Sequence, residues 1–153
     1  MNGPVVKIVS GDDSLLDAMT LWFEDAELCR VNLMPVFEDT VSRRKALAVA
    51  FFSPAISMLG IEVDGKLAGF CALAEIEDYV QVPITVAEAW ARGKGVAVEA
   101  LQQVFLLARK LRIPLLTQRI PPDNEKMIRV SKRAGFVENV AKRNGYVVLE
   151  KEV

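Results

Sequence analysis

Two glycines and two basic residues lie together in segment 92–97, directly before a long amphipathic stretch. Gly93 and Gly95 allow the backbone to turn tightly and leave its N–H groups unobstructed. Arg92 and Lys94 add two cationic side chains. If a helix begins here, free amide donors and the positive end of its dipole meet at one point, where a phosphate is stabilised. The segment therefore predicts an anion site, for a phosphate.

The stretch after the glycines predicts an amphipathic helix over residues 96–111. Apolar side chains recur at alternating steps of four and three, at Ala97, Leu101, Val104, Ala108 and Leu111. The turn before it matches neither the Walker loop nor the G-x-G-x-x-G loop, which needs a glycine where Val98 stands. A glycine turn that only caps a surface helix is the alternative interpretation.

The composition is that of a globular domain without a large net charge. The chain has 153 residues, of which 52% are apolar and 25% charged, and this length suits a single domain, 1–153, with its own core. Nineteen basic and twenty acidic residues give a net charge of −1. No bulk field therefore draws the chain to nucleic acid or to an anionic membrane.

The residue types that the sequence lacks limit its chemistry. It contains no histidine, which excludes Ser-His-Asp and Cys-His catalysis and nearly all zinc hydrolase sites. Cys29 and Cys71 do not have the spacing of metal ligands, so we expect two free thiols and no metal. We find no signal peptide, and no apolar run reaches the roughly 18 residues that span a bilayer. We therefore expect a cytoplasmic protein.

Periodicity and turn residues predict an alternation of strands and helices. We expect strands at 5–10, 56–63, 67–74, 80–86, 115–120, 136–141 and 146–150. The first helix should be capped by Asp13 or Ser14, with a stripe of Leu15, Met19, Trp22 and Ala26, and the second by Asp39 or Thr40. A loop at 31–37 separates these two helices, and a last helix runs over 124–134.

Turn residues predict how the strands are joined. Asp64-Gly65 between two apolar runs indicates a hairpin, because a type I′ turn needs positive φ at both central residues. Asn144-Gly145 indicates a second hairpin near the C-terminus. Pro83 lies inside the strand at 80–86 and cannot donate to a ladder, so one edge there should be open or bulged.

Segment 92–97 resembles the pyrophosphate loop of the GNAT family of N-acetyltransferases, with the pattern [RQ]-x-x-G-x-[GA]. Arg92, Gly95 and Ala97 occupy its three fixed positions. The hairpin at 60–70 is similar to the family's v-x-x-D/n-G-x-i-v-G meander. NEKMIRVSKRAGF at 124–136 is similar to its N-x-x-a-x-x-l-Y-x-x-x-G-F signature. The expected order of elements is also that of this family, so the resemblance covers nearly the whole chain.

The resemblance implies an α/β (α+β) fold: a mixed, mostly antiparallel central sheet, splayed between its fourth and fifth strands, with helices on both faces. Acetyl-CoA would lie in the gap as cosubstrate. Its pyrophosphate would meet Arg92, Gly93, Lys94, Gly95, Val96 and Ala97. Its pantetheine would run along 82–87, which includes Val86 and Ala87, as an added strand. The implied activity is transfer of an acetyl group to a primary amine of a small molecule or a protein.

Three residues are candidates for the proton transfers of such a reaction. Glu75 and Glu88 lie near the ends of strands that flank the implied active-site mouth, and either could be the base; each is also an ordinary solvated residue at a strand end. Ser131 stands where the family usually has a tyrosine that acts as the acid. A serine is shorter and has a much higher pKa, so a small residue beside a solvent channel is the alternative.

Other assignments stay open. Asn124 is either a ligand of the cosubstrate or an ordinary helix cap. The acidic group Glu24, Asp25 and Glu27 suits a cationic amine, but it also suits a solvated helix face. The fold leaves a C-terminal strand edge at 146–150, from which we expect a homodimer. A GNAT-fold module that binds CoA or a partner without turnover is the alternative function.

Overall fold

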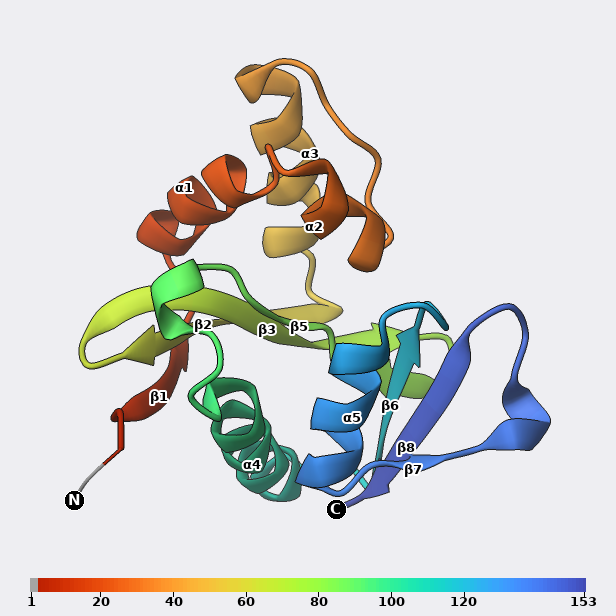
Figure 1. Ribbon diagram of the computed structural model, residues 1–153. Coiled ribbons are helices and arrows are strands. Elements are labelled where there is room, and N and C mark those ends of the chain that lie inside the picture. The colour runs from red at the N-terminus through yellow and green to blue at the C-terminus, as the bar shows by residue number, and fades with distance from the viewer. Residues whose placement is uncertain (1–2) are drawn as a thin grey trace.

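In the computed structural model, which describes residues 3–153, eight strands form one sheet between two layers of helices (Figure 1). The strands are β1 Val6–Ser10, β2 Ile56–Val63, β3 Lys66–Ile76, β4 Tyr79–Gln81, β5 Ile84–Val86, β6 Leu115–Ile120, β7 Val137–Glu138 and β8 Val147–Glu152. The helices are α1 Asp13–Trp22, α2 Ala26–Val31, α3 Thr40–Phe51, α4 Val96–Lys110 and α5 Glu125–Ala134. In Figure 1, α1, α2 and α3 cover one face of the sheet, and α4 and α5 cover the other.

The sheet has the order β1-β2-β3-β4-β6-β8-β7, and β5 also pairs with β3. The pairing is antiparallel throughout the described sheet except between β4 and β6, which are parallel. The expected mixed, mostly antiparallel sheet with helices on both faces is thus confirmed.

The turn between β2 and β3 has the predicted conformation. Asp64 has φ 52° and Gly65 has φ 81°, which is the left-handed pair that a type I′ turn requires. The Asp64 carboxylate also accepts a hydrogen bond from the N–H of Val5 at 2.9 Å. The turn therefore fixes both the β2–β3 hairpin and the start of β1.

The sheet opens between β5 and β6. β4 and β5 keep one register against β3, from Ala74↔Gln81 to Cys71↔Ile84, so they form one strand that is interrupted at Pro83, which has no N–H. On the other side, β4 pairs with β6 only at Val80 and Gln81. An edge is open here as expected, but it faces β6, whereas Pro83 itself faces β3, where its carbonyl oxygen accepts from the N–H of Ala72. The pairs on either side of Pro83 keep one register.

Each helical layer encloses a core of its own. α4 buries Ala100, Leu101, Val104, Phe105 and Ala108 against the sheet, as the predicted stripe requires, whereas Leu111 is exposed because the helix ends at Lys110. On the opposite face, α1 and α3 enclose a second core of Leu15, Leu16, Met19, Phe23, Leu47 and Phe70.

The N-terminal helices differ from the prediction. The cap of α1 is Asp12, whose side chain accepts from the N–H of Leu15, and not Asp13 or Ser14. Three helices precede β2 instead of two. The cause is Asp25, which accepts from the N–H groups of Glu27 and Leu28 and so starts α2 after a break. The predicted stripe through Ala26 is therefore wrong.

The C-terminal strands also differ. β7 contains only Val137 and Glu138, and a long connection with a 3-10 turn at Val140–Lys142 leads to β8, so Asn144-Gly145 does not close a two-residue hairpin. β8 lies between β6 and β7, because Val137 and Glu138 pair with its outer side. The strand edge at 146–150 that suggested a dimer is therefore covered at residues 148–150.

A close backbone approach holds β5 against β3, and it predicts a stability effect. A Cβ on Gly69 would lie 2.1 Å from the carbonyl oxygen of Thr85 and 3.0 Å from Cα of Val86, and main chain of a paired strand cannot move aside cheaply. We expect Gly69→Ala to lower the free energy of unfolding by about 1–3 kcal/mol. The measurement is chemical denaturation. Gly3→Ala is the control, since its Cβ would meet nothing within 4 Å; equal stability of the two variants would contradict the prediction.

Candidate active site

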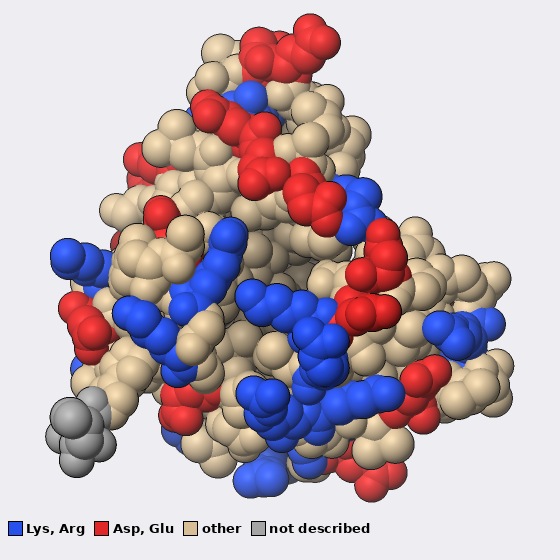
Figure 2. Space-filling view, in the orientation of Figure 1, with Lys and Arg blue, Asp and Glu red and all other residues tan. Residues whose placement is uncertain are grey.

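A cavity of about 650 Å³ occupies the opening between β5 and β6. Five parts of the chain line it: α2, the segment 81–86, the glycine segment with the start of α4, the end of β6, and α5. Figure 2 shows it as a hollow in the centre of the face that it draws. The cavity therefore lies in the gap that the sequence resemblance implied.

The glycine segment forms a tight turn at the N-terminus of α4. Gly93 and Gly95 both have φ 74°, and Gly95 is the residue that caps the helix. Gly93, Gly95, Val96 and Ala97 line the cavity. The 15-residue helix behind them adds the positive end of its dipole and unbonded N–H groups of its first turn. This end of the cavity suits an anion, and Lys94 stands outside the lining.

Arg92 lines the cavity, but its guanidinium donates two hydrogen bonds to backbone carbonyl oxygens. Its Nε donates to the carbonyl oxygen of Val86 at 3.0 Å, and one terminal nitrogen donates to that of Ala87 at 2.8 Å. The side chain thus ties the glycine turn to the end of β5. In this structure Arg92 positions the loop instead of projecting freely into the cavity.

β5 presents an unpaired backbone edge to the cavity. The N–H of Ala72 donates to Pro83 and the N–H of Ala87 donates to Ala68, so residues 83 and 87 bond to β3. Backbone groups alternate in direction along a strand, and the backbone of Ile84 and Val86 therefore faces the gap, where the carbonyl oxygen of Val86 is already bonded to Arg92. The predicted site residue Val86 lies on the open edge, whereas the N–H of Ala87 is used within the sheet and Ala87 does not line the cavity.

Charged side chains are divided between the two sides of the cavity. The basic residues in its lining are Arg92, Arg119, Lys126, Arg129 and Arg133, and the acidic ones are Asp25 and Glu27 on α2. Figure 2 shows acidic residues above the hollow and basic residues below it. The lower wall therefore attracts an anion, and the rim at α2 attracts a cation.

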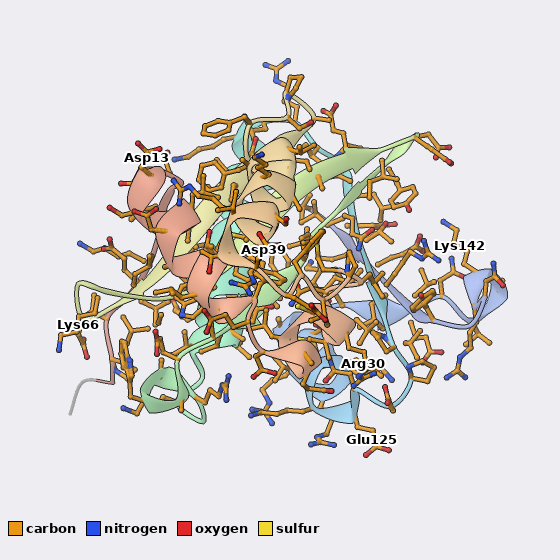
Figure 3. All side chains as sticks on the ribbon, turned by 90° about the horizontal axis from the view of Figure 1, so that it is seen from above. Asp13, Arg30, Asp39, Lys66, Glu125 and Lys142 are labelled. Carbon is orange, nitrogen blue, oxygen red and sulfur yellow. The ribbon has the colours of Figure 1, made fainter. Side chains whose placement is uncertain are left out.

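A chain of ion pairs connects the two sides of the cavity. Arg30 on α2 pairs with Glu27 and, at 3.1 Å, with Asp123 in front of α5. Figure 3 shows Arg30 and Glu125 on the same side of the molecule, where α2 approaches the start of α5. The hydrogen bond from Arg30 holds the pKa of the Glu27 carboxyl below its usual value, so Glu27 stays ionised at neutral pH.

The three catalytic candidates lie outside the cavity lining. Glu75 is exposed at the far end of β3. Glu88 is held by α1, because Nε1 of Trp22 donates to its carboxylate at 2.9 Å. Ser131 on α5 is completely buried, and its hydroxyl finds no hydrogen-bond partner among residues 3–153. The structure does not bring any of these three side chains to the cavity, and their roles stay predictions.

Asn124 lines the cavity and also caps α5. Its side-chain oxygen accepts from the N–H of Met127 at 3.4 Å, so the interpretation as a helix cap is confirmed for that oxygen. A role as a ligand stays a prediction. The acidic group is split in a similar way, since Asp25 and Glu27 line the cavity whereas Glu24 lies 3.7 Å from Arg43, away from it.

Several lining residues were not found from the sequence. Gln118 on β6 is 3% exposed and donates from Nε2 to the carbonyl oxygen of Val82 at 3.0 Å. Arg129 and Arg133 are four residues apart on α5, and this spacing is a signal that could have marked them as one basic face. Nothing in the local sequence marks Gln118, because its position depends on where β4 leaves β6.

Neither a metal-binding cluster nor a membrane-spanning helix is found in the part of the chain that the structure describes. Residues 3–153 contain no group of three or more histidine, cysteine, aspartate or glutamate side chains that could hold a metal ion. Among the same residues, every helix is too short or too polar to cross a bilayer.

Comparison with known proteins gives a family match along most of the chain. The family model for the acetyltransferase (GNAT) domain matches residues 10–137. No curated protein sequence matches the chain.

Solved structures of low sequence identity share the fold. A ribosomal L7/L12 alpha-N-protein acetyltransferase in complex with coenzyme A has a TM-score of 0.77 and 16% identity, covering 97% of this chain and 94% of its own. A spermidine N-acetyltransferase from Vibrio cholerae, in complex with CoA and spermine, has a TM-score of 0.75 and 18% identity, and the match covers 97% of this chain and 94% of the other. An aminoglycoside acetyltransferase in complex with coenzyme A and kanamycin has a TM-score of 0.75 and 15% identity, and the match covers 97% of this chain and 95% of the other.

The cysteines provide a prediction for this site. In the ribosomal-protein acetyltransferase, CoA is joined to a cysteine by a disulfide. Here Cys29 is 1% exposed and Cys71 is 0% exposed, and neither lines the cavity. Burial raises the pKa of both thiols, that of Cys71 to about 12, so little nucleophilic thiolate exists at neutral pH. We expect no mixed disulfide when the native chain is incubated with oxidised CoA, as read by intact mass, and modification of both cysteines in denaturant. An adduct on the native chain would contradict this.

Proposed function

Because the chain belongs to the GNAT acetyltransferase family, we propose that it transfers an acetyl group from acetyl-CoA to a primary amine. One observation carries the proposal: the glycine turn opens α4 at one end of a cavity whose wall is the unpaired edge of β5. An anion site and a free strand edge in one cavity suit a long ligand with a phosphate at one end and amides along its arm.

The cosubstrate would lie with its pyrophosphate on the N–H groups around Gly95, Val96 and Ala97. The basic residues of α5, Arg129 and Arg133, are close enough to the same cavity to bind further phosphate charge. The pantetheine arm would follow β5, where Ile84 and Val86 turn backbone groups toward the gap. Arg92 would act by fixing the turn against β5, and Lys94 would contribute only at long range.

The reaction requires a neutral amine. Its lone pair attacks the thioester carbon, a C–N bond forms, the C–S bond breaks, and the CoA thiolate leaves. The amine proton must pass to a base. Since Glu75 and Glu88 do not line the cavity, we propose that water carries this proton outward, past the carboxylates of Asp25 and Glu27. The carboxylate of Asp25 would also attract the protonated form of the amine to the mouth of the cavity, whereas Glu27 is already paired with Arg30.

The alternative is a module that binds CoA or a partner with little turnover. The observation that favours it is that Glu75, Glu88 and Ser131 all lie outside the cavity lining. Release of free thiol from acetyl-CoA in the presence of amines distinguishes the two functions. A cytoplasmic location and a homodimer stay predictions.

The first test of the proposal is cosubstrate binding. We expect CoA to bind to the wild-type chain and to raise its free energy of unfolding by about 2.7 kcal/mol at a hundredfold excess over Kd. Gly95→Glu should abolish binding, because it places a carboxylate where phosphate oxygens would lie. Titration calorimetry measures both.

Gly65→Glu is a matched control for this variant. Gly65 also has a positive φ, of 81° against 74° for Gly95, and a Cβ at either position meets nothing within 4 Å. The two variants therefore carry similar backbone strain, but Gly65 lies in the β2–β3 turn. If the control lost CoA binding as well, strain would explain the loss and the loop assignment would fail. If wild type did not bind CoA, the proposed function would be wrong.

The second test is turnover and its pH dependence. We expect thiol release with at least one amine from a panel of spermidine, kanamycin and a peptide that begins with serine. The rate should rise toward the pKa of the amine, about 10 for an alkylamine, and then reach a plateau, because only the neutral amine reacts. Ser131→Ala should lower kcat less than about tenfold, or 1.4 kcal/mol. A thousandfold loss with unchanged CoA affinity would contradict this expectation, and Ser131 would then be an acid or would orient a catalytic water.

A further inference from the structure

Gln118 lies where the ladder between β4 and β6 ends. The last backbone hydrogen bond between these segments runs from the N–H of Val82 to the carbonyl oxygen of Thr117 at 2.9 Å. In a continued parallel ladder, the carbonyl oxygen of Val82 would accept from a backbone N–H of β6. It accepts instead from Nε2 of Gln118 at 3.0 Å. The side-chain amide therefore caps the ladder at the point where the cavity begins.

This hydrogen bond fixes the orientation of the amide. A carbonyl oxygen can only accept, so the NH2 group of Gln118 must face Val82 and its Oε1 must face the other way. Oε1 is buried and has no hydrogen-bond partner among residues 3–153. Gln118 lines the cavity, but Oε1 itself is closed to solvent, so a donor on a molecule in the gap reaches this oxygen after a small shift of the side chain. A buried acceptor without a partner lowers stability, and a ligand that donates to it recovers that loss on binding.

Gln103 on α4 shows what a purely structural glutamine does in the same protein. Its Oε1 accepts from the N–H of Ile8 at 2.9 Å, and its Nε2 donates to the carbonyl oxygen of Val6 at 2.7 Å. Both ends of that amide are used to hold β1, and Gln103 does not line the cavity. Gln118 differs because only one end is used, so its second end is available to a ligand.

We infer that Oε1 of Gln118 accepts a hydrogen bond from the amide N–H of the pantetheine arm that is nearest to the thiol. This inference rests on the proposed function, since it takes CoA as the ligand. An arm that lies between β5 and β6 has polar groups toward both strands. Those toward β5 meet the backbone groups of Ile84 and the N–H of Val86, since the carbonyl oxygen of Val86 already accepts from Arg92, and those toward β6 need a partner there. Gln118 lies at the closed end of the gap, opposite to the glycine turn, so it meets the end of the arm that carries the thiol.

The test compares a ligand that has the arm with one that lacks it. CoA and adenosine 3′,5′-bisphosphate are titrated by calorimetry into wild type and into Gln118→Met, which removes the amide and roughly keeps the volume. We expect CoA affinity to fall about five- to twentyfold in the variant, and the affinity for the bisphosphate to stay within twofold. Gln103→Met is the matched control, for which both affinities should stay within twofold.

Other results would overturn the inference. A parallel fall in both affinities would mean that Gln118 only shapes the cleft. An unchanged CoA affinity would mean that its oxygen has no partner on the arm, and an effect confined to KM of the amine would assign the donor to the acceptor substrate. In these cases CoA still binds wild type and the proposed function stands. Absence of CoA binding to wild type would instead refute the proposed function, and the inference with it.

A measurement on the wild-type protein covers the case in which Gln118→Met does not fold. The side-chain amide resonances of Gln118 are followed by NMR, with those of Gln103 as an internal reference. We expect CoA to shift the Gln118 signals, and the bisphosphate to leave them in place. Signals of Gln118 that do not respond to CoA, or that respond equally to both ligands, would refute the contact.

Discussion

The hydrogen bonding of segment 79–86 on its two sides is the constraint on which the cavity depends. On the side of β3, one register continues through Pro83, and Gly69 allows the backbone of β5 to approach closely. On the side of β6, the backbone ladder stops at Val82. One strand is therefore held firmly by one neighbour and released by the other. This asymmetry gives the protein an open strand edge inside a stable sheet, which an ordinary sheet would pair or cover.

The helices make this opening into a site with two unlike sides. α4 begins at the gap and directs its first N–H groups and its dipole toward it, and α5 adds basic side chains. α2 adds two carboxylates from the opposite face of the sheet. Because α2 is a separate helix, started by Asp25, its acidic end faces the cavity instead of continuing along α1. The division of charge thus follows from where the helices begin and end.

Backbone groups and amides lie beside ionisable side chains in the lining of the cavity. Its lining includes the glycine turn, the edge of β5 and the amide of Gln118, whereas its two carboxylates lie at the rim. Such a lining suits the binding of an extended ligand, and the proposed reaction would have to proceed without Glu75, Glu88 or Ser131 in the cavity lining. A reaction whose nucleophile is already a neutral amine is compatible with this arrangement, because orientation is then the main requirement.

The sequence by itself determined the features that depend on neighbouring residues. Positive φ at Asp64 and Gly65, the glycine turn before α4, and the apolar stripe of α4 all follow from short-range sterics and periodicity. With the family motifs, these features were sufficient to predict the fold and the location of the cavity. The order of strands near the C-terminus was not predictable in this way, because Val137 and Glu138 select their partner across the sheet.

Only the tertiary structure decided which side chains reach the cavity. The position of Glu88 after a strand made it a candidate base, but its carboxylate accepts a hydrogen bond from Trp22 on α1. Gln118 carries no local signal, yet the departure of Val82 from β6 makes it the residue that ends the ladder. The physical reason is the same in both cases: the direction of a side chain is set by partners far away in the sequence, and these become neighbours only when the sheet and its two helical layers have assembled.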